Sequence, residues 1–344
     1  MSRRALTLLL AIGLALVLGV GAAVAPVPYV ELEPGPTFNT LGTENNRPDG
    51  TPVIVITGRQ TYPDEGHLDL TTVGVQPRLT LSQALRGWFD RDVAVVPREI
   101  VYPPDQTDEQ VDRANTEQMV QSQSSATTAA LTSLRIPSQV VVAQVSASAP
   151  ATGKLKEGDV LTSVDGTAVT GSAQLRDLIS SRTPGSAVRV GYTRAGTAGV
   201  AVIATGRAEG EPQRAVIGVG PQDRFPVQVK INLEEVGGPS AGLMFALGII
   251  DKLEPGSLTG GRYVAGTGTM ADDGAVGPIG GIAQKLIAAR KKGATVFLTP
   301  AADCGEALGN VPDGLQLVRV GSLSEALAGL STLRAGGTPP TCTR

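Results

Sequence analysis

Two stretches decide the fold: GGPSAGLMFALGIID occupies residues 237–251, and AGTGTMADDGAVGPIGGIAQK occupies residues 265–285. In the first, glycines and a proline precede an apolar run, which predicts a tight turn leading into a helix over residues 240–251. Around the second, we predict a strand over 263–268 and a helix over 283–292 that ends at a glycine. The C-terminal part is therefore expected to be a mixed domain of helices and strands.

Ser240 is the first candidate for chemistry. It stands at the start of the predicted helix, where free backbone N–H groups and the helix dipole can stabilise an oxyanion. The surrounding residues also satisfy G-x-S-x-G, which α/β-hydrolases use with a histidine that follows the serine. The sequence has one histidine, His67, and it lies upstream, so a hydrolase triad and an esterase are excluded. We interpret His67 as a strand or surface residue. The alternative for Ser240 is an ordinary serine at a helix entry.

The base must then be another residue type, and a Ser-Lys pair is the known alternative. Lys285 lies on the helix predicted over 283–292, among apolar neighbours that include Ile282 and Leu286. Its pKa must fall by about three units from about 10.4 to serve near neutrality, which corresponds to about 4 kcal/mol and is within what burial can give. The alternative is a surface lysine whose stem covers apolar neighbours.

Together the two stretches closely resemble the proteolytic domain of Lon proteases, and most closely the membrane-anchored, PDZ-containing Lon-like subgroup often called YlbL-type. The resemblance implies Ser240 as nucleophile and Lys285 as general base. It also implies that Thr267 orients the lysine and that the backbone around Gly238 and Ser240 forms the oxyanion hole. Gly237 departs from the family, which carries an acidic residue at this position.

A second resemblance lies upstream of the Ser240 segment. Ser148-Ala149-Pro150-Ala151, Gly158-Asp159-Val160-Leu161, Val164-Asp165-Gly166 and a hairpin over 188–196 together resemble a PDZ domain. Such a domain leaves a strand edge beside a helix, where an extended peptide can add as a strand. The family's glycine-rich carboxylate loop is expected near residues 134–137, which contain no glycine. The alternative is that the domain is only a spacer.

The N-terminus predicts the compartment. Arg3 and Arg4 precede an apolar run over residues 5–27, about the length of a membrane-spanning helix. The positive-inside rule places the N-terminus in the cytoplasm and the rest outside, so we expect a single-pass protein of the cell membrane with an extracytoplasmic catalytic part. A cleaved signal peptide ending at Ala25 is the alternative, although Pro26 usually hinders such cleavage.

The two cysteines, Cys304 and Cys342, predict one disulfide in an oxidising compartment, with two free buried thiols as the alternative. Neither has metal-ligand spacing, so no metal and no cofactor is predicted.

Charge and composition limit the partners. The net charge is −3, aromatic residues make up 3%, and the chain has no Lys/Arg-rich run, which argues against nucleic acid. The chain also lacks G-x-x-x-x-G-K-[ST], because Gly153-Lys154 has neither the earlier glycine nor the hydroxyl. An enzyme without a nucleotide site is expected to cleave peptides or unfolded proteins. By analogy with the rings that Lon proteolytic domains form, a homo-oligomer is expected.

The predicted fold class is therefore α+β: a Lon-type proteolytic domain and a β-rich PDZ domain after one transmembrane helix. The boundaries that we predict are 1–27 for the anchor, 28–135 for the first part of the Lon-like domain, 136–208 for the PDZ domain, 209–332 for the catalytic part and 333–344 for a tail. The PDZ domain is thus inserted within the protease domain. The predicted function is an ATP-independent serine endopeptidase with PDZ-mediated binding of substrates or partners. The alternative is a non-catalytic envelope scaffold that binds peptides.

Overall fold

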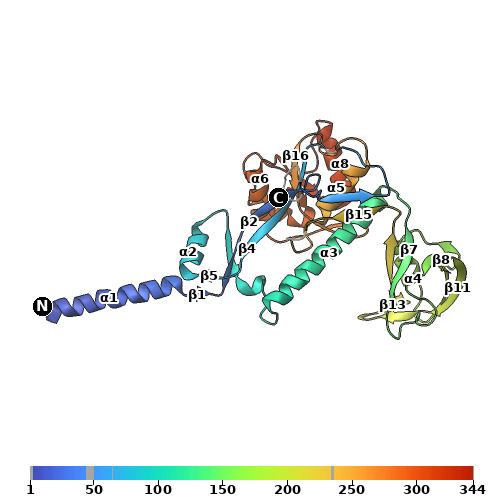
Figure 1. Ribbon diagram of the computed structural model, residues 1–344, viewed down its shortest axis with the longest axis horizontal. Coiled ribbons are helices and arrows are strands. Elements are labelled where there is room, and N and C mark those ends of the chain that lie inside the picture. The colour runs from blue at the N-terminus through green and yellow to red at the C-terminus, as the bar shows by residue number, and fades with distance from the viewer. Residues whose placement is uncertain (1–2, 44–49, 64, 234–235, 344) are drawn as a thin grey trace.

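The structure is a computed structural model, and it describes residues 3–43, 50–63, 65–233 and 236–343. The side chains of residues 3–8 and 11 lie outside this description. Figure 1 shows an N-terminal helix that projects from a body of helices and strands, and a smaller β-rich lobe on the opposite side of that body.

A six-stranded mixed sheet forms the centre of the body. Its order is β20-β19-β16-β4-β2-β6. The strands are β2 (Tyr29–Asn39), β4 (His67–Gln76), β6 (Ala94–Pro97), β16 (Tyr263–Gly266), β19 (Val296–Pro300) and β20 (Gln316–Val320). The last three and β4 run parallel, while β2 is antiparallel to β4 and β6. The parallel strands are short apolar runs because helices cover both of their faces.

Successive residues of these strands enter two different cores. Val264 and Leu298 pack with α3 (Asp108–Ser133), α5 (Gly242–Leu253) and α8 (Leu323–Arg334). Ala265 and Phe297 pack on the other face with α6 (Ile282–Lys292) and α7 (Cys304–Leu308). All residues of α5 are buried, which explains why its sequence is apolar on every side.

Helix α3 begins well before the part of it that is most buried. Most of its buried residues lie from Met119 onward, but the helix begins at Asp108, after a capping box in which Thr107 and Gln110 each bond the other's backbone. Its small residues, such as Ala126 and Ala130, are fully buried in the core shared with α5. Helix α2 (Leu81–Phe89) begins with the same kind of capping box, formed by Thr80 and Gln83.

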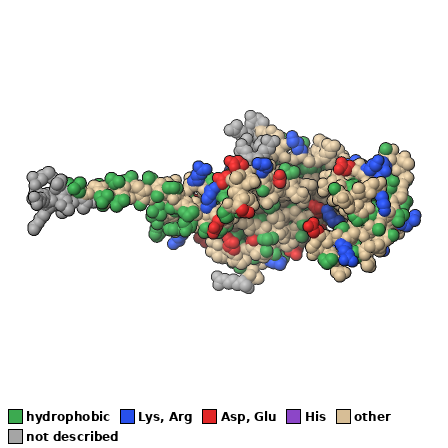
Figure 2. Space-filling model, turned by 90° about the horizontal axis from the view of Figure 1, so that it is seen from below, with side chains coloured by type: hydrophobic (Ala, Val, Ile, Leu, Met, Phe, Trp, Pro, Cys, Tyr) green, Lys and Arg blue, Asp and Glu red, His purple; other side chains and the backbone are tan. Residues whose placement is uncertain are grey.

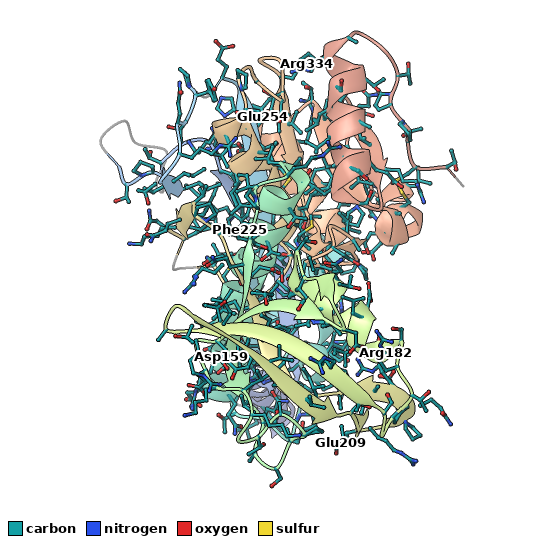
Figure 3. The ribbon with its side chains drawn as sticks, turned by 90° about the vertical axis from the view of Figure 1, so that its right-hand side faces the viewer. Asp159, Arg182, Glu209, Phe225, Glu254 and Arg334 are labelled. Atoms are coloured by element: carbon teal, nitrogen blue, oxygen red, sulfur yellow. A yellow bond between two sulfur atoms is a disulfide. The ribbon has the colours of Figure 1, made fainter. Side chains whose placement is uncertain are left out.

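The β-rich lobe has a core of its own. Its strand order is β11-β10-β8-β7-β14, with β9 beside β8 and helix α4 against the sheet. The elements are β7 (Gln139–Val145), β8 (Val160–Val164), β9 (Thr167–Ala168), α4 (Ser172–Ser180), β10 (Ala187–Arg194), β11 (Thr197–Ala204), β12 (Gly206–Ala208), β13 (Glu211–Val216) and β14 (Val219–Arg224). In Figure 3, Asp159, Arg182 and Glu209 lie in this lobe, Glu254 and Arg334 lie in the body, and Phe225 lies where the two meet.

The lobe interrupts the body in sequence. One hydrophobic core joins residues 41–136 to residues 227–333, so the body is built from both sides of the lobe. The chain enters and leaves the lobe at adjacent points, because Gln139 and Arg224 are register partners in β7 and β14. The Arg224 guanidinium also donates to Gln139 Oε1 at 2.9 Å.

The N-terminal helix α1 (Arg3–Val24) is followed by β1 (Pro26–Val27), which pairs with β5 (Leu79–Thr80) immediately before α2. In the part of the chain that the structure describes, no helix is both long and apolar enough to span a bilayer. The anchor predicted over residues 1–27 falls partly on residues outside that description.

Smaller elements complete the body. They are β3 (Ile54–Thr57) paired with β15 (Gln228–Ile231), β17 (Thr269–Met270) paired with β18 (Val276–Gly277), and the short 3-10 helices Arg98–Ile100 and Ala301–Asp303. A disulfide joins Cys304 at the start of α7 to Cys342, with their Cα atoms 5.3 Å apart. It fastens the C-terminal segment beside β20, where Arg319 N donates to Pro340 O.

Candidate active site

Ser240 lies in the turn that leads into α5, two residues before the first helical residue. The helix predicted over 240–251 therefore begins later, at Gly242, because the Ser240 carbonyl is bonded outside the helix. It accepts from Gly268 N at 2.8 Å and from Thr267 Oγ1 at 3.0 Å. Gly242 is required at the helix start, since a Cβ there would lie 2.7 Å from Met270 Cβ. The serine is thus held against the segment that follows β16.

Lys285 lies in the first turn of α6, and its side chain enters the protein interior. The residue is 3% exposed, and Nζ donates to Thr267 Oγ1 at 3.2 Å. Burial lowers the pKa of Lys285 to about 8, while the nearby negative charge of Asp303 acts in the opposite direction. At pH 7, a lysine with this pKa is neutral in about a tenth of the molecules. The surface-lysine alternative is therefore wrong.

Thr267 connects the two segments. Its hydroxyl accepts from Lys285 and donates to the carbonyl of Ser240, so one side chain touches both candidate residues. A cavity of about 450 Å³ is lined by Ser240 and Lys285 together with residues of β2, β4 and the 236–241 loop. Ser240 and Lys285 therefore line one cavity.

Glycine 281 allows α6 to begin where it does. It caps the helix in the left-handed conformation with φ of 68°, and a Cβ there would lie 2.7 Å from Val73 Cγ2. The close approach of α6 to β4 is what brings Lys285 under the cavity.

The candidate oxyanion hole is less complete. Gly238 has a φ of 83°, but its N–H donates to Asn115 O at 2.9 Å. In this conformation the Gly238 amide is engaged by α3 and does not point to a free ligand position. Gly237 is also close to α3, since a Cβ there would lie 3.0 Å from Asn115 Cβ. An acidic side chain at position 237, as the resemblance implies, would need Asn115 to move.

Asp303 was missed by the sequence analysis. It is a buried residue in the turn after β19, and its Oδ2 accepts from Ile279 N at 3.1 Å. Burial and the charge of Glu306 raise the pKa of Asp303, whereas the hydrogen bond from Ile279 N–H and the charge of Lys285 lower it; the net shift is upward. The carboxylate thus holds the loop that precedes α6. Its position after a parallel strand is the signal that could have found it, because such strand ends gather functional side chains.

The other sequence candidates lie elsewhere. His67 starts β4 but is not among the residues that line the cavity, and it stacks on Tyr263, with ring centroids 4.3 Å apart. Within the described residues, no group of three or more His, Cys, Asp or Glu side chains could hold a metal.

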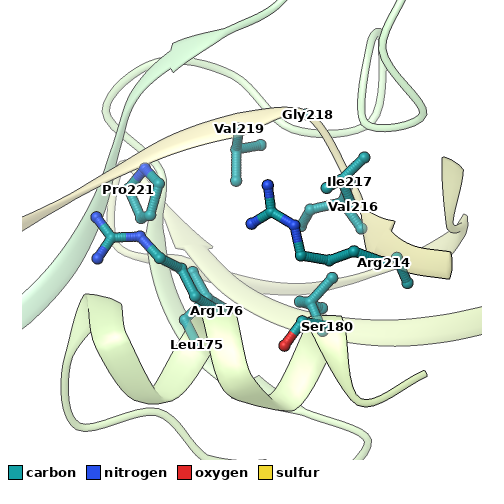
Figure 4. A pocket seen from close by; sticks show the side chains of 11 residues that line it. Leu175, Arg176, Ser180, Arg214, Val216, Ile217, Gly218, Val219 and Pro221 are labelled. Carbon is teal, nitrogen blue, oxygen red and sulfur yellow. The ribbon is translucent and has the colours of Figure 1, made fainter. Parts of the chain in front are cut away.

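A second cavity, of about 230 Å³, lies in the β-rich lobe between α4 and residues 214–221 (Figure 4). Its walls are mainly apolar, and Arg176 and Arg214 extend along it. The carboxylate loop that we expected near residues 134–137 is not part of this groove, because Ile136 packs into the core of the body. The groove is instead lined by Val216-Ile217-Gly218-Val219, which lie beside α4. A Cβ on Gly218 would lie 2.2 Å from Ala149 Cβ, so this position needs glycine.

The lobe touches the body through a charged pair near the active-site segments. Arg176 of α4 lies 3.7 Å from Asp272 Oδ2, in the loop between β17 and β18. Asp272 Oδ1 also accepts from Ser125 of α3 at 2.8 Å. The groove and the segment after Thr267 therefore share a contact.

Comparison with known proteins identifies two domains. Residues 113–203 match the PDZ domain, and residues 234–330 match the Lon protease (S16) C-terminal proteolytic domain. The chain thus combines a PDZ domain with a Lon-type proteolytic domain of mixed helix and strand content. The PDZ match begins inside α3 and ends before β14, although β14 pairs with β7 in the lobe.

Individual relatives give the same picture. The chain is 37% identical to a Lon protease of Clostridioides difficile (strain 630) over 93 residues, which is 26% of this chain and 12% of that protein. It is 35% identical to Lon protease 1 of Sorangium cellulosum (strain So ce56) over 101 residues, which is 28% of this chain and 12% of the relative. The matched segment therefore spans only a small part of these curated relatives.

Among solved structures, PDZ domains of SdrC-like proteins are similar. The domain from Listeria monocytogenes is 28% identical and covers 24% of this chain and 85% of its own, with a TM-score of 0.23. The domain from Listeria innocua is 27% identical and covers 24% of this chain and 92% of its own, with the same TM-score.

Proposed function

We propose that the chain is an ATP-independent serine endopeptidase in which Ser240 is the nucleophile and Lys285 the general base. The single observation that carries the proposal is the contact of Thr267 with both residues at the edge of one cavity. The match of residues 234–330 to a Lon proteolytic domain supports a protease of this class.

The proposed reaction begins with neutral Lys285. One hydrogen of the Lys285 amine remains hydrogen-bonded to Thr267 Oγ1. The lone pair of Nζ is then left to accept the proton of Ser240 Oγ. The oxygen attacks the substrate carbonyl carbon, and the resulting ammonium returns its proton to the leaving amine as the C–N bond breaks. Water then hydrolyses the acyl-enzyme by the same proton route. Rotation of the 237–238 peptide away from Asn115 would free a backbone N–H for the oxyanion.

The proposed substrates are peptides and unfolded proteins. The sequence lacks a phosphate-binding loop, so no ATP-driven unfolding step is proposed for this chain. The apolar groove beside α4 supports a peptide-binding role for the PDZ domain, with an extended segment added along residues 216–219. Arg176 and Arg214 would favour an acidic side chain or a terminal carboxylate on that segment.

We also propose that residues 5–27 anchor the chain in the cell membrane, with the catalytic part outside the cytoplasm. The apolar run and the basic residues before it support this orientation. The Cys304–Cys342 disulfide is compatible with an oxidising compartment. A homo-oligomer remains a proposal by analogy with Lon rings.

The test is cleavage of an unfolded protein by the full chain in detergent without ATP. Ser240→Ala and Lys285→Ala are expected to abolish cleavage. Ser331→Ala and Lys291→Ala are matched controls, since both side chains are exposed and Lys291 lies on the same helix as Lys285. Cleavage by the folded Ser240→Ala variant at the wild-type rate would refute the dyad. A wild-type chain that binds peptides but cleaves nothing would favour the non-catalytic scaffold.

A further inference from the structure

Helix α2 carries an apolar face that the protein leaves uncovered. Leu85, Trp88 and Phe89 are 43%, 53% and 89% exposed. Their spacing of three and four residues places them on one side of the helix. The opposite side packs closely, because Ala84 and Gly87 are buried and a Cβ on Gly87 would lie 2.6 Å from Val95 Cγ2. The helix is thus fixed to the sheet with its aromatic side turned outward.

This face lies at the base of the projecting helix. β1, directly after α1, pairs with β5, directly before α2, and Leu81 N donates to Ala25 O at 2.9 Å. Trp88 also meets Tyr29, just after β1, with ring centroids 5.7 Å apart. The end of α1 and the start of α2 are therefore held together by backbone bonds.

The surface of α1 is apolar as well. From Leu9 to Val24 its large side chains are about half to two-thirds exposed, including Leu10, Val17 and Val20. Figure 2 shows hydrophobic side chains along the projecting helix and gathered again where it joins the body. The two apolar surfaces are therefore joined at one end of the molecule.

The residue types on the exposed face of α2 indicate a lipid surface as its partner. Trp and Phe beside Leu on a short amphipathic helix are typical of the boundary between lipid headgroups and acyl chains. The charges around this face are mixed, since Arg86 and Arg91 alternate with Asp90 and Asp92. Attraction to anionic lipid is therefore not required, and insertion of apolar side chains is the expected source of binding.

We propose that α2 lies in the surface of a phospholipid bilayer, with Leu85, Trp88 and Phe89 on the acyl side. The proposal rests on the membrane location proposed above, but not on the protease activity. It adds a second membrane contact beside α1 and fixes which end of the body faces the lipid. The cavity of Ser240 would then be held at a constant orientation to the membrane.

Trp88 is the only tryptophan of the chain, so its fluorescence reports on α2 alone. The full chain is reconstituted into phosphatidylcholine vesicles, recovered by flotation, and compared in plain and brominated lipid. We expect brominated lipid to lower Trp88 emission at least twofold and vesicles to protect it from aqueous iodide. Phe89→Asp is expected to reverse both effects. The control Val120→Asp, on an exposed position of α3, is expected to change neither.

The outcomes separate the two proposals. A chain that does not float with vesicles overturns both the anchor and the α2 contact. A chain that floats, with Trp88 quenched by iodide and not by bromine, overturns the α2 contact alone. Protection from iodide that depends on protein concentration, without bromine quenching, would overturn it in favour of a second copy of the chain.

Discussion

The cavity lined by Ser240 and the groove beside α4 hold their cationic side chains in opposite ways. In the cavity lined by Ser240, Lys285 is almost completely buried, and its pKa falls to about 8. In the groove of the lobe, Arg176 and Arg214 remain at the surface around an apolar floor. Burial of a cation lowers the stability of the fold and creates a base, whereas an exposed cation costs little and can only attract a ligand. The difference teaches that the reactivity of the lysine depends on its burial, whereas recognition of a ligand depends on arginines that stay exposed to solvent.

The largest effect is expected from a substitution that removes the buried cation. Lys285→Met keeps the length of the side chain and should reduce cleavage by at least about 1,000-fold, since the proposed general base is lost. The same change should raise the stability at pH 7 by up to about 3 kcal/mol, because a pKa lowered from 10.5 to about 8 measures the cost of burying the ammonium. Peptide cleavage and thermal unfolding check the two parts. An unfolding midpoint lower than wild type would contradict this account of burial.

Removal of the contact between the two segments should have the next largest effect. Thr267→Val preserves the shape but takes away the hydroxyl that touches Lys285 and Ser240. We expect kcat to fall about 10- to 100-fold with little change in KM, because the base is misoriented. Thr267→Ser should restore most of the rate. Equal losses in the valine and serine variants would point to packing instead of orientation.

The pH dependence follows from the direction of the Lys285 shift. Only the neutral amine accepts the serine proton, so kcat/KM should rise about tenfold per pH unit below 8 and level off above it. The plateau should begin well below 10.5, the pKa of an unburied lysine. Rates on a short peptide from pH 6 to 9 provide the measurement. A profile that is flat over this range would show that the rate does not depend on the protonation of Lys285.

The smallest effect is expected in the groove. Arg176→Ala with Arg214→Ala should weaken binding of a peptide with an acidic C-terminus by about three- to tenfold, because exposed ion pairs contribute little. Arg214→Ala alone leaves the Arg176–Asp272 contact in place, so it should not change the cleavage of a short peptide that does not use the groove. Arg207→Ala, an exposed arginine of the same lobe outside the groove, is the matched control. Fluorescence anisotropy with the labelled peptide measures the affinity. Equal binding by all variants would show that neither arginine contributes to recognition of the peptide.

Contiguous motifs made most of the site predictable. Ser240, Thr267 and Lys285 lie on the two segments that the sequence analysis identified, and the structure brings all three together. Asn115 and Asp303 lie outside these two segments, and they reach the site from α3 and from the turn after β19. Their contributions exist only after the body has folded.

The groove shows the same limit at the level of topology. The expected order placed its loop before β7, but the segment beside α4 is residues 216–219, which join the end of β13 to the start of β14. Hydrophobic periodicity shows that a strand exists but does not show which neighbour it pairs with. The start of α3 is a different case, because Thr107 and Gln110 have the spacing of a capping box. That pattern indicates a helix start from the sequence alone.

The adjacent entry and exit of the lobe bear on how the protease proposed above would withstand cleavage by other copies of itself. Gln139 and Arg224 pair where the chain crosses between body and lobe, so the lobe is attached by two backbone connections. A single cut in either crossing would leave the other intact, and the β7–β14 ladder would keep the severed end in register. Loss of the lobe would require two separate cleavages. A self-cleaving population would therefore accumulate nicked molecules that still carry both domains.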